Sequence, residues 1–287
     1  MHSQFDSRPS ASTAFSFPLK SSFTDVLMSY APHLLPGANN SDFGSRGRNQ
    51  IEFEHGTTIV AATYADGVVL AGDRRATAGS MISKRDMRKI FRTDEYSAAG
   101  AAGAWGFAVE IMRLFQVELE HYEKMEGREL SLVGKANRLG TMVKGNLAAA
   151  MQGLAVIPLF AGYDVGTGRA HIYSYDVAGG PFEEQQFHSI GSGSIFAKSS
   201  LKKLYIEGMP VQDAILACLQ ALYDAADDDS ATGGPDLARQ IFPVAATVTA
   251  NGFVWVSDEE CTEYSRAVVE QRLCSPDGPT APLTASQ

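Results

Sequence analysis

Extended segments and pairs of amphipathic helices follow one another from Thr57 onward, and this order limits the fold more than any other feature of the sequence. A doubly wound parallel sheet would alternate single strands with single helices, whereas helix pairs between groups of strands suit antiparallel sheets covered by helix layers. We therefore predict an α+β fold with two antiparallel sheets in four α/β/β/α layers. Strands are expected at 57–64, 68–73, 89–92, 96–103, 155–163, 169–176, 187–190, 244–249 and 253–257, and helices at 104–126, 131–152, 194–207 and 210–226.

Local signals support these boundaries. The dipeptides Asp66-Gly67 and Asn251-Gly252 favour tight hairpin turns between the strands on either side. In the segment 104–126, apolar residues recur every three or four positions, which is the period of a helix with one buried face. Gly127 favours the left-handed conformation that ends many helices, and Ser131 is a suitable N-cap for the next helix.

The first 56 residues differ from the rest, because they are rich in serine, contain four prolines and show no sustained periodicity. They lack the basic start and apolar block of a secretory signal. One short piece at 23–30 is compatible with two helical turns, with Phe23, Val26, Leu27 and Tyr30 on one side. By composition alone this leader is typical of a disordered tail. The end of the chain, 275–287, is rich in Pro, Thr and Ser, and we predict that it is frayed.

The charge balance and the cysteines argue against several function classes. With 33 acidic and 24 basic residues the net charge is −9, whereas binding to nucleic acid requires a basic surface. The longest apolar run, 154–160, contains a proline and is far shorter than the roughly 18 residues of a membrane span. Three cysteines without metal-ligand spacing favour a reducing compartment. We expect an intracellular protein with no nucleic-acid partner, no membrane contact, no cofactor and no metal.

One group of residues carries a chemical signal. Gly56 and Thr57 are followed at defined spacing by Asp73, Lys89 and Gly103, while the chain has no phosphate-binding loop, dinucleotide fingerprint or GxSxG elbow. Taken singly, each residue has an ordinary interpretation as a strand start, a surface charge or a turn. Their combined spacing behind a glycine makes a catalytic interpretation the more favourable one.

The segment 57–103 resembles the start of a proteasome β subunit, and the family's order can be followed to about Leu273. The run Asp73-Arg-Arg-Ala-Thr77 and the acidic segment 227–236 are most similar to the actinobacterial form. The resemblance implies an N-terminal-nucleophile hydrolase fold and a threonine-type endopeptidase. It also implies that residues 1–56 are a propeptide, removed autocatalytically by cleavage between Gly56 and Thr57. The peptidase domain would then span 57–274, and 275–287 would be a flexible tail.

The resemblance gives each site residue a role that elementary chemistry explains. A hydroxyl needs a base at neutral pH, and the α-amine of a freed Thr57, with a reference pKa of about 7.7–8.0, lies within reach of its own Oγ. Lys89 would favour the developing alkoxide, and Asp73 would keep Lys89 protonated. The backbone N–H of Gly103 would donate to the oxyanion. By resemblance three further residues orient the amine, which are Ser192, Asp227 and Ser230.

The family's first specificity pocket maps onto five apolar residues, which are Ala76, Met87, Ala101, Trp105 and Val109. Since none of them is acidic, we expect cleavage after apolar residues, and the bulk of Trp105 favours medium-sized side chains over large aromatic ones. Thr77 and Gly103 would hold the peptide through main-chain hydrogen bonds, which read no side chain and therefore allow broad specificity.

The resemblance also implies an assembly. The chain would form two seven-membered β rings between two rings of α subunits (α7β7β7α7), with a regulatory ring ATPase at the α ends and polypeptide substrates, in the cytoplasm. An HslV-type two-ring peptidase is the first alternative, although the long leader and Arg74-Arg75 argue against it. A catalytically silent ring subunit is the second, and the complete set of site residues argues against that.

Overall fold

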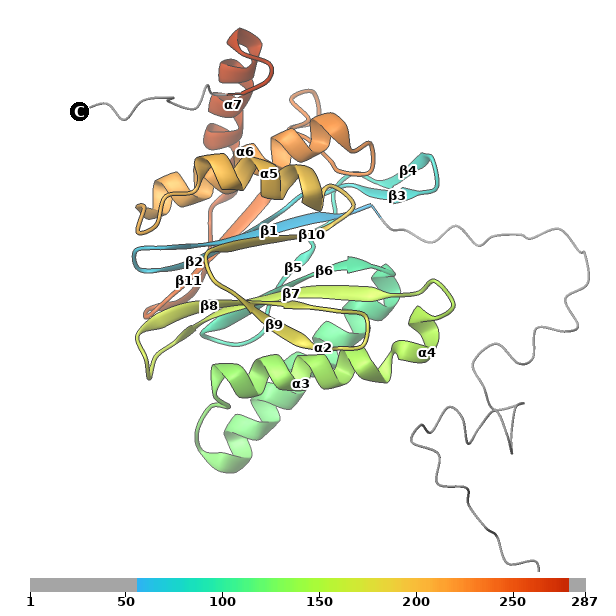
Figure 1. Cartoon of the computed structure of the whole chain (residues 1–287), viewed down its shortest axis with the longest axis vertical. Coiled ribbons are helices and arrows are strands. Elements are labelled where there is room, and N and C mark those ends of the chain that lie inside the picture. The colour runs from blue at the N-terminus through green and yellow to red at the C-terminus, as the bar shows by residue number, and fades with distance from the viewer. Residues whose placement is uncertain (1–55, 279–287) are drawn as a thin grey trace, which may run out of the picture. The chain divides into compact units, whose positions relative to one another are not determined.

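Two five-stranded antiparallel sheets lie face to face in the computed structural model, which describes residues 56–278 (Figure 1). The possible helix at 23–30 and residues 279–287 lie outside the described residues. The first sheet has the order β10 (Phe187–Gly191), β1 (Thr58–Tyr64), β2 (Gly67–Gly72), β11 (Val244–Thr249) and β12 (Gly252–Trp255). The second has the order β5 (Ile90–Arg92), β6 (Ser97–Gly103), β7 (Val156–Asp164), β8 (Arg169–Tyr175) and β9 (Pro181–Glu184).

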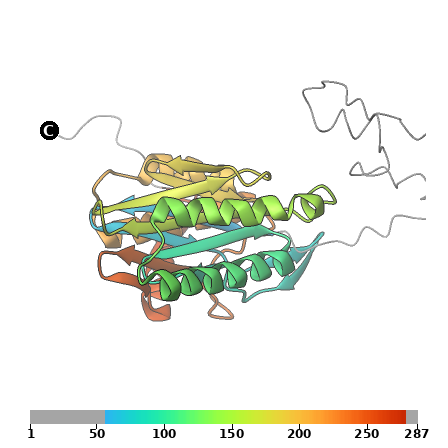
Figure 2. The same cartoon turned by 90° about the horizontal axis from the view of Figure 1, so that it is seen from below.

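Helices cover the outer face of each sheet, so the four predicted α/β/β/α layers are confirmed (Figures 1 and 2). The first sheet is covered by α5 (Ser194–Leu204), α6 (Val211–Asp228) and α7 (Asp258–Cys274). The second is covered by α2 (Trp105–Glu126) and α3 (Leu132–Gly145), which the short α4 (Leu147–Ala150) follows. Within residues 56–278, no helix combines the length and apolarity that crossing a bilayer requires.

Both faces of each sheet are buried, because apolar side chains project from both sides of its strands. In β7, Leu159 packs between the two sheets, whereas its neighbour Phe160 packs under α2 and α3. Successive side chains of a strand face opposite sides, so one strand supplies two cores. In the other sheet, Ile59 of β1 faces β7 while Val60 faces α5 and α6. Burial on both sides holds the sheet ends in place, and the candidate site is built at one of these ends.

Several elements were not expected from the sequence. A two-stranded sheet of β3 (Ala76–Ala78) and β4 (Met81–Lys84) projects after β2, and all four residues of β4 are exposed, so no apolar alternation marks it. Strand β9 was also missed, and the helix expected at 131–152 ends at Gly145 before α4. Helix α7 was missed because two of its four buried residues are polar, Ser265 and Arg272, which leaves little apolar periodicity. Residues 275–278, the start of the expected tail, form a turn in which the Ser275 hydroxyl donates to the carbonyl of Gly278 at 2.7 Å.

Strand pairing brings distant parts of the chain to one end of the first sheet. The hairpin of β1 and β2 pairs Ile59 with Gly72, so the next residues, Thr58 and Asp73, are neighbours. On the other side of β1, Thr58 pairs with Gly191 of β10, which places Ser192 beside the start of β1. The loop after α6 reaches the same end, as the contacts described below show.

Candidate active site

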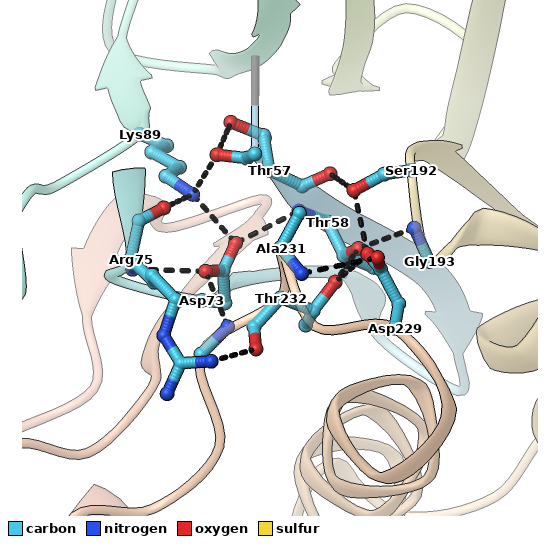
Figure 3. Close-up of polar contacts among 12 residues, drawn as sticks. Thr57, Thr58, Asp73, Arg75, Lys89, Ser192, Gly193, Asp229, Ala231 and Thr232 are labelled. Atoms are coloured by element: carbon cyan, nitrogen blue, oxygen red, sulfur yellow. Dashed lines mark hydrogen bonds and ion pairs between the residues drawn. The ribbon is translucent and has the colours of Figure 1, made fainter. Parts of the chain in front are cut away.

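Thr57 lies just before β1 with its side chain turned toward the preceding peptide (Figure 3). The residue is 3% exposed, and its hydroxyl donates to the carbonyl oxygen of Gly56 at 2.6 Å. Gly56 is tightly enclosed, since a Cβ on it would lie 2.4 Å from Oγ1 of Thr77 and 2.6 Å from the carbonyl oxygen of Ala231. The structure therefore describes the chain with the Gly56–Thr57 bond intact and its carbonyl beside the threonine hydroxyl.

Lys89 lies beneath the same carbonyl and is completely buried. Its Nζ donates to the Gly56 carbonyl oxygen at 2.9 Å, to Oδ1 of Asp73 at 2.7 Å and to the carbonyl oxygen of Arg75. An ammonium group has three N–H donors, and these three acceptors use them all. Burial lowers the pKa of Lys89, and the adjacent Asp73 carboxylate acts in the opposite direction. The Gly56 carbonyl thus occupies one donor of this lysine.

Asp73 is held by backbone donors on both carboxylate oxygens. Its Oδ1 accepts the N–H of Thr58 at 2.8 Å in addition to Lys89, and its Oδ2 accepts the N–H groups of Arg75 and Gly233 at 2.9 Å each. The side chain has no solvent exposure. These backbone donors, together with Lys89, hold the carboxylate in one position beside the ammonium group.

Ser192 joins the start of β1 to the loop after α6. Its backbone N–H donates to the carbonyl oxygen of Thr57 at 2.9 Å, and its hydroxyl donates to Oδ2 of Asp229 at 2.6 Å. The hydroxyl of Thr232 donates to the same Asp229 oxygen, also at 2.6 Å. A charged acceptor strengthens such bonds, and these distances are at the short end of the O–H···O range.

The structure corrects the position of the acidic partner by two residues. The sequence prediction paired Ser192 with Asp227 and Ser230, but both of these side chains are exposed. Asp227 lies in the last turn of α6, whereas Asp229 follows the helix end and turns back toward Ser192. Ser230 contributes its backbone carbonyl, which accepts from Nη1 of Arg75 at 3.0 Å. Asp227 and Ser230 were predicted as an aspartate followed three residues later by a hydroxyl residue, and in the structure Asp229 and Thr232 form such a pair.

Gly103 is the last residue of β6 and has a φ of +104°, in the region that favours glycine. A Cβ here would lie 2.1 Å from the carbonyl oxygen of Ala155, so no other residue fits this backbone. Helix α2 begins two residues later with no acidic residue in its first turn. The positive end of its dipole is left without a side-chain counter-charge at this point.

The residues expected to bind substrate lie on three elements, β3, β6 and α2, and in the loop before Lys89. Ala76 and Thr77 belong to β3 and are buried, and Met87 is partly buried in the loop. Ala101 of β6 and Trp105 of α2 pack in one apolar cluster, where the Trp105 ring lies 5.8 Å from that of Phe91. Val109 is partly buried one turn further along α2. Of this set, Thr77 is the residue that lies against Gly56.

Besides Asp229 and Thr232, four further residues that the sequence prediction did not select hold this arrangement together. They are Thr58, Arg75, Gly193 and Gly233. Arg75 ties the loop after α6 to the end of β2, because its Nη1 donates to the carbonyl oxygens of Ser230 and Thr232 at 3.0 Å each. The pairs Thr57-Thr58 and Arg74-Arg75 stand out in the sequence beside the predicted site residues. The sequence does not show, however, in which direction the side chains of Thr58 and Arg75 point. Among the described residues, no cluster of three or more His, Cys, Asp or Glu side chains could hold a metal ion.

Comparison with known proteins places the chain in a family. Residues 53–236 match the proteasome subunit family. The chain is 59% identical over 263 residues to a protein named proteasome subunit beta from Streptosporangium roseum, a match that covers 92% of each chain. It is 57% identical over 270 residues to the proteasome subunit beta of Streptomyces griseus, covering 94% of this chain and 95% of the relative. A third proteasome subunit beta, from Acidothermus cellulolyticus, is 52% identical over 273 residues, with 94% and 93% covered. Given these matches and the layered fold, the chain belongs to the proteasome subunit family, as a β subunit with peptidase function that assembles with other proteasome subunits.

Proposed function

We propose that this β subunit is a threonine-type endopeptidase that activates itself by cutting the Gly56–Thr57 bond and then uses Thr57 as its nucleophile. One observation carries the proposal: the hydroxyl of Thr57 and the ammonium group of Lys89 both contact the carbonyl oxygen of Gly56, at 2.6 Å and 2.9 Å. A nucleophile and a positive charge meet at the carbonyl of the bond that is to be broken.

This geometry supports self-cleavage. Oγ of Thr57 attacks the Gly56 carbonyl carbon, and negative charge develops on the oxygen to which Lys89 already donates. The Gly56–Thr57 C–N bond breaks, an ester to Oγ forms, and the nitrogen leaves as a free amine. A water accepts the Oγ proton and delivers one to the nitrogen, because an amide nitrogen cannot serve as the base. A second water hydrolyses the ester, which releases the leader as a carboxylate and restores the hydroxyl.

Cleavage creates the general base and releases a donor of Lys89. The new α-amine, with a reference pKa of about 7.7–8.0, is well matched to accept the Oγ proton near neutral pH. When Gly56 leaves, the Lys89 N–H that it occupied can turn toward Oγ and favour the alkoxide. Attack on a substrate carbonyl then forms an ester to Oγ, the amine passes its proton to the leaving peptide, and water completes hydrolysis.

The neighbouring polar groups have separate roles in this reaction. Because the Ser192 hydroxyl donates its proton to Asp229, its lone pairs are free to accept an N–H of the Thr57 amine and orient it. Gly103 supplies the backbone N–H for the oxyanion, supported by the positive end of α2. Asp73 keeps positive charge on Lys89 against the effect of burial.

The position of Gly56 in the intact chain indicates where a substrate residue would bind. In the intact chain it occupies the position of the residue whose carbonyl is attacked, and Thr77 lies against it. We therefore assign Thr77 and Gly103 to main-chain binding of the peptide. Side-chain preference is assigned to the apolar set, with cleavage after apolar residues, and this set comprises Ala76, Met87, Ala101, Trp105 and Val109.

For the assembly, we propose two β rings between two α rings (α7β7β7α7), in the cytoplasm, with a regulatory ring ATPase that delivers unfolded polypeptides. The relatives named proteasome subunit beta favour this arrangement over the HslV-type particle of two rings. The mass of the intact particle, purified with and without a separate α subunit, distinguishes the two. A closed chamber also suits a peptidase of broad specificity, because it keeps the site away from folded proteins.

The deciding experiment is to determine the N-terminus and activity of the assembled particle. We expect the wild-type chain to begin at Thr57 and to hydrolyse peptides, whereas Thr57→Ala keeps its leader and has no activity. Thr63→Ala changes a threonine of the same strand outside the site and should be processed normally. A Thr57→Ala particle with normal turnover would overturn the proposal, and an intact Met1 leader on the wild-type particle would favour the silent subunit.

A further inference from the structure

Thr58 contacts Asp73 on one side and the Gly193–Thr232 pair on the other, although its side chain faces away from Thr57 (Figure 3). The residue has no solvent exposure. Its backbone N–H donates to Oδ1 of Asp73 at 2.8 Å, which is the oxygen that binds Lys89. Its Oγ1 accepts the backbone N–H of Gly193 at 3.0 Å and lies 2.6 Å from Oγ1 of Thr232.

Proton counting fixes the direction of these hydrogen bonds. The single hydroxyl proton of Thr232 is given to Oδ2 of Asp229, since a carboxylate can only accept. The proton between the two threonines must then come from Thr58. The chain of donors therefore runs from the N–H of Gly193 through Thr58 and Thr232 to Asp229, which also accepts from Ser192. Such chains polarise each of their members.

The packing around the Thr58 hydroxyl leaves little freedom. A Cβ on Gly193 would lie 2.6 Å from Oγ1 of Thr58 and 2.7 Å from Oγ1 of Thr232. The backbone that follows Ser192 therefore rests directly on the two hydroxyls. Removing the Thr58 hydroxyl would leave the buried N–H of Gly193 without its acceptor and Thr232 without its donor, and unsatisfied buried groups are costly.

We propose that Thr58 is a positioning residue, whose hydroxyl holds Gly193 and Thr232 so that Ser192 and Asp229 orient the amine of Thr57. This inference rests on the proposed function, because the amine is the base in that reaction. Thr58 touches neither the scissile carbonyl nor Oγ of Thr57, so its effect passes through its neighbours. A small displacement of catalytic groups is sufficient to slow a reaction strongly.

The test compares Thr58→Val, which keeps the shape and loses the hydroxyl, with Thr58→Ser, which keeps the hydroxyl. In assembled particles, with rates normalised to the fraction of chains that begin at residue 57, we expect Thr58→Val to lower kcat about tenfold with KM within about twofold. Thr58→Ser should restore most of kcat. Thr63→Val is the matched control, because Thr63 lies on the same strand and its hydroxyl contacts Gln186 and Tyr205, away from the site.

A double variant tests the route of the effect. If Thr58 acts through Asp229, then Thr58→Val combined with Asp229→Asn should be little slower than Asp229→Asn alone. Should Thr58→Val remain uncut, the same variants are made in a chain in which Thr57 directly follows the initiator methionine, so that removal of that methionine frees the amine.

Unchanged kcat in Thr58→Val, or equal losses in Thr58→Val and Thr58→Ser, would overturn the inference. A fully additive double variant would also overturn it. These failures differ from failure of the proposed function, which would appear as normal hydrolysis by Thr57→Ala.

Discussion

Nζ of Lys89 lies 2.9 Å from the carbonyl oxygen of Gly56, so the lysine proposed to serve substrate hydrolysis also contacts the bond that the proposed self-cleavage would break. In the intact chain this carbonyl takes one of the three donors of the ammonium group. The same charge can therefore stabilise the oxyanion of self-cleavage and, after the leader departs, the alkoxide of Thr57. In the proposed mechanism, one buried ion pair with Asp73 supports both steps.

Gly56→Ala should slow removal of the leader. A Cβ at this position would lie 2.4 Å from Oγ1 of Thr77 and 2.6 Å from the carbonyl oxygen of Ala231, so the scissile carbonyl must shift from its place beside Thr57. We expect cleavage at least about tenfold slower, followed by gel electrophoresis or intact mass during assembly. Gly145→Ala is the control, because a Cβ there meets nothing within 4 Å, and it should be cut at the wild-type rate. Equal cleavage rates in the two variants would contradict the placement of Gly56.

Asp229→Asn and Asp227→Asn should differ sharply although both remove one negative charge. Asp229 accepts the hydroxyl protons of Ser192 and Thr232, whereas Asp227 is exposed in the last turn of α6. We expect kcat to fall about tenfold or more for Asp229→Asn and to stay within about twofold for Asp227→Asn, measured with a fluorogenic peptide. The reverse order would restore the assignment predicted from the sequence.

Asp73→Asn should impair both processing and turnover. The four donors around this side chain come from Lys89, Thr58, Arg75 and Gly233, and an amide offers one oxygen and an NH2 group that faces two of these donors in either orientation. We expect kcat/KM to fall about 100-fold or more, with the leader largely retained. Asp86→Asn removes a carboxylate that is 57% exposed, and it should behave as the wild type. Normal processing of Asp73→Asn would contradict a role for the ion pair.

Activity should decline at alkaline pH as Lys89 loses its proton. A lysine is charged below its pKa and neutral above it, so the electrostatic help is present at low pH and disappears as the pH rises. Because burial lowers the pKa of Lys89 from its ordinary value of 10.5, the decline should begin below that pH. The measurement is kcat/KM against pH, with particle integrity checked by gel filtration at each point. A rate that stays constant through pH 10.5 in intact particles would show that the charge of Lys89 is not needed.

Much of the fold could be predicted because its signals are local. The Asp66-Gly67 signal indicated the β1–β2 hairpin, although its two loop residues are Ala65 and Asp66, and Gly67 already pairs with Tyr64. Apolar periods indicated α2, α3 and α6. Helix α7 was not predicted because its buried face includes Ser265 and Arg272, so no continuous apolar stripe marks it. Strand β4 was not predicted because all of its residues are exposed, so it shows no alternation of apolar and polar residues.

The sequence by itself determined which residues are candidates, because their chemistry and spacing are distinctive: a glycine before Thr57, then Asp73 and Lys89, which the structure brings together. The tertiary structure decided which of three consecutive aspartates reaches Ser192, because the end of α6 sets their directions and the sequence makes them equivalent. It also decided the role of Thr58, whose hydroxyl meets Gly193 and Thr232 only because β1 pairs with β10 and the loop after α6 folds back over that pair. The sequence gives the chemical type of each residue, whereas the direction of its side chain depends on contacts between segments that are far apart in the sequence.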